Sequence, residues 1–352
     1  MNFKKGLAIG IILLFISVIV IPSTGTVVEK SSLVSFDGKT LYVGGDGPGN
    51  YTKIQDAIDD ASDGDTVFVY AYSSPYHENV KVDKSINLIG EDRDSTIIDG
   101  DEDVINISAD WVNISGFTIK NSGDELGYGI KIDANYNTIV GNRILGNLFG
   151  VLSLSNRNNN ISGNIISSND FGICSCRDDN TNIYSNTIIN NIGCGILIEH
   201  SDETEISRNY ISDNYWGILL VDSQHDVITG NTIKNNKWGI EIIDSSDYLI
   251  SRNNITNNQI GINLIWHSFG IVKENNFIEN GRSVDYDIFF NRWIRNYWDD
   301  WDSLLPRPIK GKCTFVNLSL LLSDIFKKNV DISIPWVQFD WCPAEEPYDI
   351  GV

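Results

Sequence analysis

Apolar and polar positions recur about every 22 residues between Asn137 and Asn280. Each repeat holds a glycine followed by Val or Ile, and most repeats place an isoleucine eleven positions later. These two columns are Gly150, Gly172, Gly195, Gly217, Gly239 and Gly261, and Ile161, Ile183, Ile206, Ile228 and Ile250. A fixed period of this length is typical of a solenoid, in which each unit buries an apolar face only against its neighbours.

The segments between polar positions are too short for helices. They run for three to five residues and alternate, so that Ile240 and Ile242 share one side while Glu241 and Ile243 share the other. Enrichment in Ile, Val and Thr favours strands. The pattern predicts an all-β chain, a parallel β-helix with three short strands per coil, in which Ile206 and Ile228 point inward and stack.

Two columns of asparagine flank a third apolar position in each repeat. One runs from Asn142 to Asn275 and the other from Asn147 to Asn280. Asparagine tolerates left-handed backbone, and stacked amides can hydrogen-bond along a column. We therefore expect these asparagines to adopt left-handed corners and to form amide ladders.

The N-terminal residues predict export. Lys4 and Lys5 precede an uncharged, mostly apolar run from Gly6 to Ile21, which is the layout of a secretory signal. An uncleaved anchor is the alternative, and would be the chain's one membrane contact. The expected parts are a signal peptide or anchor over 1–25, a linker over 26–40, the β-helix over 41–291 and a Trp-rich C-terminal cap over 292–352.

A short amphipathic helix is expected near 53–61. Thr52-Lys-Ile-Gln55 has the form of a capping box, and Ile54, Ala57 and Ile58 make one apolar stripe. Such a helix would cover the open end of the solenoid, where unpaired strand edges otherwise promote aggregation.

The last 60 residues contain five of the nine tryptophans. We expect them to cap the final coil, with an aromatic ligand platform as the alternative. Outward apolar residues of the repeats form a stripe that the tail or a partner should cover: Leu152, Leu154, Leu197, Leu219, Val221, Ile243 and Ile265.

The five cysteines agree with export. Cys174 and Cys176 should face outward on one strand, and Cys194 lies at a one-residue slip of the repeat. Cys313 and Cys342 lie in the tail and are expected to come within disulfide reach. Because five is odd, at least one thiol stays unpaired.

The charge of the chain limits the classes of partner that it is expected to bind. The chain has 47 acidic and 26 basic residues and a formal net charge of −21. No basic stripe is present to pair with phosphates, so nucleic acid is not an expected partner. The same charge disfavours unassisted binding of polyanions such as pectate.

The segment ahead of the repeats carries further motifs, Gly64-Asp-Thr-Val67 and Tyr76-His-Glu78. With the Asn-x-Ile and Gly-Ile repeats, residues 41–280 resemble right-handed parallel β-helix proteins of the pectin-lyase-like superfamily. They are most similar to its NosD-type branch of secreted carbohydrate-binding and sugar-hydrolase repeats, of the archaeal secreted type. The resemblance implies the fold more than a function, because the superfamily mixes lyases, hydrolases, esterases, epimerases and inert binders.

Catalytic signals are few. The lyase chemistry that the resemblance implies needs a basic residue near calcium-binding carboxylates, and Arg177, Asp178 and Asp179 are the nearest candidates. A hydrolase would need carboxylates converging from neighbouring coils and a Gly-His-Gly turn, which the sequence lacks. We favour a turn role for Asp178 and Asp179.

Metal signals are equally few. Asp99, Asp101 and Asp103 form an acidic loop that is the candidate for calcium, with a solvated loop as the favoured interpretation. No other cofactor is expected. The NosD resemblance implies copper, but the one methionine is the initiator and the four histidines are separated, so we expect no copper site.

The position before each glycine is aromatic in most repeats. Trp216 and Trp238 fall on adjacent coils, with Tyr215 beside them, and could stack sugar rings; a self-packing aromatic ladder is the alternative. The sequence therefore predicts a secreted or cell-surface protein that binds a polysaccharide or other glycan without catalysis. The alternatives are a polysaccharide lyase, glycoside hydrolase or epimerase, and a structural or adhesive surface protein.

Overall fold

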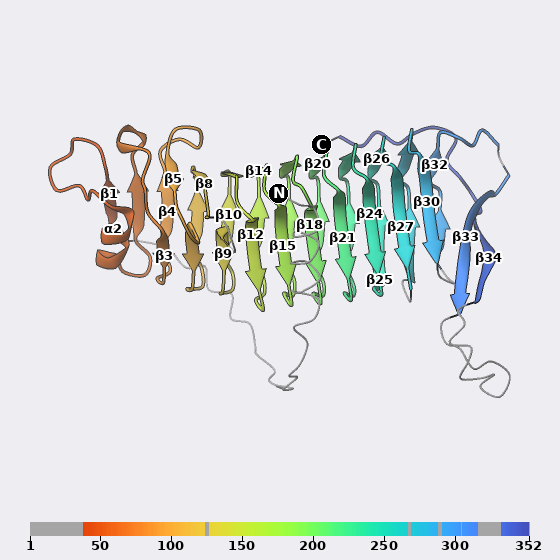
Figure 1. Ribbon diagram of the computed structural model, residues 1–352, viewed down its shortest axis with the longest axis horizontal. Coiled ribbons are helices and arrows are strands. Elements are labelled where there is room, and N and C mark those ends of the chain that lie inside the picture. The colour runs from red at the N-terminus through yellow and green to blue at the C-terminus, as the bar shows by residue number, and fades with distance from the viewer. Residues whose placement is uncertain are drawn as a thin grey trace, which may run out of the picture.

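The computed structural model of the chain describes residues 38–123, 127–266, 269–287, 291–303, 305–315 and 332–351. Their strands stack one coil upon the next into an elongated solenoid (Figure 1). Adjacent coils pair in parallel, with Ile206 opposite Ile183 on one side and Ile228 on the other. The predicted parallel β-helix, with about 22 residues and three short strands per coil, is confirmed.

Most coils contribute one strand to each of three stacks. The first stack contains β3 (Val80–Val82), β6 (Ile105–Ile107), β9 (Tyr128–Ile132), β12 (Phe149–Leu154), β15 (Phe171–Cys176), β18 (Cys194–Glu199), β21 (Trp216–Val221), β24 (Trp238–Ile243), β27 (Ile260–Ile265), β30 (Arg282–Asp287) and β33 (Arg307–Phe315). The second stack contains β1 (Thr40–Val43), β2 (Thr66–Val69), β4 (Asn87–Gly90), β7 (Asn113–Ser115), β10 (Thr138–Val140), β13 (Asn160–Ser162), β16 (Asn182–Tyr184), β19 (Glu205–Ser207), β22 (Val227–Thr229), β25 (Ser246–Ser251), β28 (Phe269–Lys273), β31 (Arg292–Ile294) and β34 (Ile332–Asp340). The third stack contains β5 (Ile97–Asp99), β8 (Thr118–Lys120), β11 (Arg143–Leu145), β14 (Ile165–Ser167), β17 (Thr187–Ile189), β20 (Tyr210–Ser212), β23 (Thr232–Lys234), β26 (Asn254–Thr256), β29 (Asn276–Ile278) and β32 (Tyr297–Trp298).

Apolar side chains fill the inside of the solenoid from all three stacks. Ile206 and Ile228 are fully buried and lie opposite each other, as predicted. Each such isoleucine contributes roughly 1.5–3 kcal/mol by leaving water. At the start of the first-stack strands the coils approach so closely that a Cβ on Gly217 would lie 2.5 Å from the carbonyl oxygen of Gly239. This contact explains the glycine column.

The asparagine columns form buried amide ladders, as predicted. Asn231 Nδ2 donates to Asn253 Oδ1 at 2.9 Å and to the backbone oxygen of Ile206 at 2.9 Å. The expectation that these asparagines adopt left-handed backbone is wrong, because φ is positive one residue earlier, at Gly230 (67°) and Arg252 (54°). The chain turns just before the asparagine, which leaves its amide free to align with the next coil.

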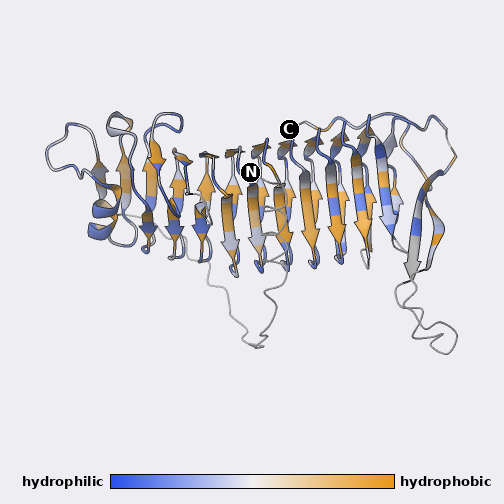
Figure 2. Cartoon of the chain, in the orientation of Figure 1, coloured by the Kyte–Doolittle hydropathy of each residue, from blue (hydrophilic) through white to orange (hydrophobic). Residues whose placement is uncertain are grey.

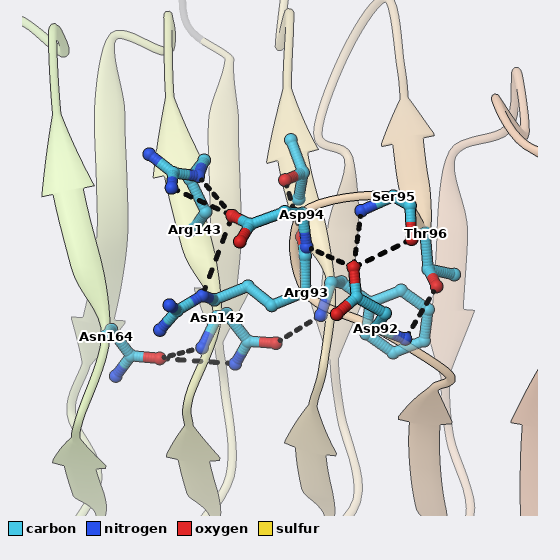
Figure 3. A network of polar contacts seen from close by, with 10 residues as sticks. Asp92, Arg93, Asp94, Ser95, Thr96, Asn142, Arg143 and Asn164 are labelled. Atoms are coloured by element: carbon cyan, nitrogen blue, oxygen red, sulfur yellow. Dashed lines mark hydrogen bonds and ion pairs between the residues drawn. The ribbon is translucent and has the colours of Figure 1, made fainter. Parts of the chain in front are cut away.

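Figure 3 shows where the first ladder begins. Asn142 bonds to Asn164 there, and the Arg143 guanidinium donates to the Asp94 carboxylate at 2.8 and 3.0 Å. Asp94 belongs to the loop between β4 and β5, which also contains an Asp92 carboxylate that accepts from Ser95. These contacts fasten a long corner loop to a later coil.

Helix α2 (Ile54–Asp60) covers the N-terminal end, near the expected 53–61. The capping-box prediction at Thr52 is wrong, since the N-cap residue is Lys53 and makes no side-chain cap bond. Instead the Glu78 carboxylate accepts from the backbone nitrogens of Ile54 and Gln55 at 2.9 and 3.1 Å. A carboxylate at this end of a helix satisfies unpaired N–H groups and the helix dipole.

Export signals lie outside the part of the chain that the structure describes, because the expected signal peptide or anchor spans 1–25. Within the described ranges, no helix is long and apolar enough to cross a membrane.

The solenoid continues past residue 291, the expected end of the repeats. β31 and β32 extend the second and third stacks, and the antiparallel hairpin of β33 and β34 closes the end. The buried Asp340 carboxylate terminates the first amide ladder by accepting from Asn296 N and Nδ2 at 2.9 and 3.1 Å. It supplies the acceptor that a further coil would have provided.

The C-terminal tail runs back along the solenoid (Figure 1). Asn276 Nδ2 donates to the Tyr348 carbonyl at 2.9 Å, and Asn254 Nδ2 donates to the Ile350 carbonyl at 3.1 Å. Both asparagines belong to the third stack. The tail therefore lies along that stack, so of the two covers expected for the outward apolar stripe of the first stack, the tail or a partner, it is not the tail.

The expected disulfide between Cys313 and Cys342 is not formed, since Cys342 is a free, exposed cysteine. The hairpin register explains this, with Arg307 opposite Asp340 and Cys313 opposite Ile334. Cys313 lies six residues from Arg307 along β33, about 20 Å at 3.4 Å per residue, whereas Cys342 lies only two residues beyond Asp340. The chain between Asp340 and Cys342 is too short to bring the two α-carbons within the roughly 7 Å limit of a disulfide.

Candidate functional site

The outer face of the first stack carries a column of aromatic residues immediately before the glycine column. Phe149 and Phe171 are buried and stacked, with ring centroids 5.0 Å apart. Trp216 and Trp238 follow in the same column, opposite each other in adjacent coils, and both are partly exposed. The structure therefore brings together two candidate residues of the sugar-stacking prediction on one flank.

Tyr215, the third candidate, extends this surface sideways. Its ring centroid lies 4.2 Å from that of Trp216, at an angle of 59°. Lys237 Nζ lies 4.2 Å from the Tyr215 ring centroid and 6.0 Å from that of Trp238, and it donates to the Tyr215 hydroxyl. The Lys237 ammonium attracts the faces of both rings and helps to fix their positions, and it places a positive charge at the edge of this surface.

Glu241 and Asn263 belong to the same surface, and the sequence analysis did not propose them. Glu241 is 6% exposed, and its carboxylate accepts from the Trp216 indole nitrogen and from Asn263 Nδ2. Burial raises the pKa of this carboxyl above its ordinary value, while both hydrogen bonds oppose the shift. The available signal was a change within one outward column, where Leu219 is followed by Glu241 and Asn263.

The earlier coils of the same face are apolar. Leu152, Cys174 and Leu197 form a buried cluster with Phe149 and Phe171, and Trp216 and Leu219 pack at its edge. Cys174 and Cys176 lie on the outer face as expected, but both are buried. Burial raises the pKa of the Cys174 thiol well above its usual value, so this thiol is not a reactive thiolate.

The catalytic candidates Arg177, Asp178 and Asp179 lie at a corner. Asp178 is fully buried, and its carboxylate accepts from Asn156 N at 2.6 Å and from Ser175 Oγ at 2.8 Å. Asp179 pairs through its backbone with Arg157 of the preceding coil. The Asp178 carboxylate is thus used by the backbone and side chain of the corner.

The calcium candidates Asp99, Asp101 and Asp103 do not converge on one point. Asp99 forms an ion pair with Lys120 at 3.0 Å and accepts from Asn121. Asp101 accepts from Asn79 at 2.6 Å, and Asp103 accepts from the Tyr128 backbone at 3.4 Å. Each carboxylate is used by a different neighbour.

A second polar cluster lies where the first-stack strands end. Cys176 Sγ donates to Glu199 Oε2 at 3.8 Å, and the His200 ring lies 3.6 Å from Glu199 and 3.1 Å from Asp222. Burial raises the pKa of the Glu199 carboxyl. Glu199 therefore lies between Cys176 and His200 and contacts both.

Two family models match the chain. Residues 58–227 match the model described as "Periplasmic copper-binding protein (NosD)", and residues 181–288 match the one described as "Right handed beta helix region". The comparison with curated proteins gave no match.

Several solved structures share the fold. The complex of XylC with xylose superposes with a TM-score of 0.56 at 12% identity, covering 73% of this chain and 75% of that one. The Dettilon tailspike protein gives 0.55 at 15% identity, covering 73% and 62%. The enzymatically active domain of tailspike protein 2 from bacteriophage CBA120 gives 0.55 at 12% identity, covering 69% of this chain, which spans only 44% of that domain. At these identities the likeness concerns the fold alone.

The copper in the NosD description can be tested against the side chains. Copper sites in proteins use imidazole, thiolate and thioether ligands. Over the described ranges, no group of three or more His, Cys, Asp or Glu side chains is arranged to hold a metal ion. Cys176 and His200 both contact Glu199 instead, so the described residues do not fit a copper centre.

The two family models overlap and together cover residues 58–288, which includes most of the stacked coils. The repeat pattern, the parallel pairing and both models agree. The chain therefore has the right-handed parallel β-helix fold, and parts of it match these two family models.

Proposed function

We propose that this protein binds carbohydrate on the outer face of its first stack, and that Tyr215, Trp216 and Trp238 form the binding surface. The observation that carries the proposal is the pair of partly exposed indoles in register on adjacent coils. A flat apolar ring packs well against the C–H face of a sugar ring. Rings on coils about 4.8 Å apart can contact a saccharide that runs along the solenoid.

Fixed polar groups support the same surface. Glu241 holds the plane of the Trp216 indole through its hydrogen bond, and Asn263 holds Glu241. Lys237 and Tyr215 supply donors at the rim. Apolar rings with a small number of oriented polar groups are the usual composition of a small-ligand site.

The fold neighbours support carbohydrate as the ligand class. One of them was solved with xylose, and two others are tailspike proteins, one of them described as an enzymatically active domain. No residue is carried over from them, since the identities are 12–15%. The ligand residues proposed here come from this chain alone.

We place the protein outside the cytoplasm. The NosD model is described as periplasmic, and Lys4 and Lys5 ahead of the apolar run from Gly6 to Ile21 have the layout of a secretory signal. Carbohydrate polymers of cell surfaces are accessible from that side of the membrane.

Binding without turnover is the favoured form of the proposal, because Asp178 is used by the corner backbone. One observation favours an enzyme as a second candidate. Glu241 is a buried carboxyl with a raised pKa beside the proposed sugar surface, and such a group can act as a general acid. Release of reducing ends or unsaturated products from a bound oligosaccharide, lost in Glu241→Gln, would identify this second function.

The test is an array of immobilised oligosaccharides probed with the full chain and with the double variant Trp216→Ala, Trp238→Ala. Tyr184→Ala removes an aromatic side chain that is 40% exposed on the second stack and serves as the matched control. We expect the wild type and the control to bind the same saccharides and the double variant to lose them. Equal binding by all three proteins would refute the assignment of this surface.

A further inference from the structure

Trp111 and Tyr136 form a second aromatic surface, at the corner between the first and second stacks. Their rings are nearly parallel, 6° apart in orientation, with centroids at 4.4 Å. Trp111 is 47% exposed. The pair lies one coil apart, because Trp111 N donates to the backbone oxygen of Asn135, the residue before Tyr136.

The backbone conformation at this corner does not favour aromatic residues. Trp111 and Tyr136 have φ of 62° and 59°, a left-handed conformation that is unfavourable for bulky side chains. The following coils place Asn158 (58°) and Asn180 (53°) at the same corner, and asparagine accepts this conformation readily. Stacking on Tyr136 buries one face of the Trp111 ring. It does not explain why the rest of the Trp111 side chain is exposed.

Polar side chains lie directly beside the two rings. Asp110 Oδ1 accepts from the backbone and side-chain nitrogens of Asn135 at 2.7 and 3.3 Å. Asn135 Oδ1 in turn accepts from Arg157 N at 3.0 Å. These bonds orient a carboxylate and an amide next to the stacked pair, and a carboxylate retains further acceptor capacity for hydroxyl groups.

We propose that Trp111 and Tyr136, with Asp110 and Asn135, form a second carbohydrate-binding site that takes a pyranose ring against the exposed part of Trp111. The following coils adopt the same left-handed corner, so the fold explains the backbone but not the presence of two bulky aromatic residues on it. Oriented acceptors beside an aromatic face suit the hydroxyl and C–H surfaces of a sugar. This site is separate from the Trp216 surface. Trp216 is the first residue of a first-stack strand, whereas Trp111 and Tyr136 come after the ends of strands of that stack.

Trp111→Asn separates the ligand role from the folding role. Asparagine fits the left-handed backbone, so the variant should unfold at the same temperature as the wild type or higher. On an array of glucose, galactose, mannose, xylose and uronic acid oligosaccharides, followed by titration calorimetry of each ligand found, we expect at least a tenfold loss of affinity for one group of saccharides. Asn135→Ala should weaken the same group.

Trp266→Ala is the matched control. Trp266 is 56% exposed and also left-handed, with φ of 58°, but it follows β27 at a different corner column. The Trp266→Ala variant should bind every saccharide with the affinity of the wild type. Wild-type affinity in Trp111→Asn for every ligand, or no saccharide bound by the wild type, would overturn the second site.

Trp238→Ala distinguishes the two proposals. Loss of one group of ligands in Trp111→Asn and retention of that group in Trp238→Ala supports the second site, whatever happens at the first. Loss in Trp238→Ala alone supports the proposed function and refutes the second site.

Discussion

One outward column of the first stack holds Cys174 and Leu197 in β15 and β18, and Glu241 and Asn263 in β24 and β27. The inward column beside it holds Ile173, Ile196, Ile240 and Ile262 in the same four strands. Figure 2 shows the outcome, since the first-stack strands are mostly orange around β18 and largely blue at β30. The inner face stays constant while the outer face changes from apolar to polar.

Outward positions of the first stack carry information about function that its inward positions do not. Inward positions face a close-packed interior in every coil, so nearly every coil needs a similar apolar residue. Outward positions are not bound by that requirement. A polar residue at an outward position, such as Glu241, therefore reflects what the surface contacts rather than what the fold needs.

The largest effect is expected on the inner face. Ile228→Asp places an unpaired charge where the isoleucine is fully buried, which should cost about 5 kcal/mol or more and prevent folding. Far-UV circular dichroism and size exclusion measure the outcome. Val227→Lys, on the outward side of the same strand and opposite Glu205, is the control and should fold. A soluble, native-like Ile228→Asp variant would contradict the register.

The second-largest effect is expected on the pH dependence of stability, from the buried Asp226 carboxyl. Burial raises the pKa of Asp226 from 3.8 to about 7, so the folded state holds a proton that the unfolded state has released. Stability should therefore fall as pH rises from about 4 to about 7, by roughly 4 kcal/mol at most. Asp226→Asn should remove this loss, as measured by urea unfolding at several pH values.

The control for that experiment is Asp213→Asn at an exposed corner, which should leave the pH profile of the wild type unchanged. A profile that Asp226→Asn does not flatten would show that the carboxyl is charged in the folded state.

The amide ladder should give a smaller loss. Asn231 accepts from Asn209 N at 2.9 Å and donates to Asn253 Oδ1 at 2.9 Å. Asn231→Ala leaves buried groups in both neighbouring coils without partners, which should cost roughly 2–3 kcal/mol. Asn180→Ala removes an exposed asparagine and should cost much less. Equal losses in thermal unfolding would show that the ladder contributes nothing beyond the corner.

The smallest difference concerns the two tryptophans. Trp216→Phe removes the indole donor to the buried Glu241 carboxyl, so it should cost about 1–2 kcal/mol. Trp238→Phe leaves that bond in place and should cost less than about 0.5 kcal/mol, as usual for partly exposed positions. Thermal unfolding of both variants measures this. A larger loss for Trp238→Phe would reverse the roles assigned to the two rings.

The sequence predicted the features that repeat. The Ile206 and Ile228 column and the asparagine ladders follow from period and residue type, because every coil solves the same packing problem. The features that occur once were not predictable in this way. Glu78 caps α2 across 24 positions, and Asp340 ends a ladder from the far side of the terminal hairpin.

The candidate site was predicted in part, for the same reason. Trp216 and Trp238 stand out within an aromatic column, whereas Glu241 becomes a partner of Trp216 only through contact between neighbouring coils. Trp111 and Tyr136 are 25 positions apart, outside the regular 22-residue spacing, so the repeat alone did not align them. Contacts that depend on irregular coil lengths need coordinates.

The central claim is that Trp238 binds ligand and contributes little to the stability of the fold. The direct measurement is the affinity of Trp238→Ala for the best saccharide found on the array, with its unfolding temperature measured on the same preparation. We predict at least a tenfold loss of affinity with an unfolding temperature close to that of the wild type. Unchanged affinity, or a large fall in the unfolding temperature, would contradict the claim.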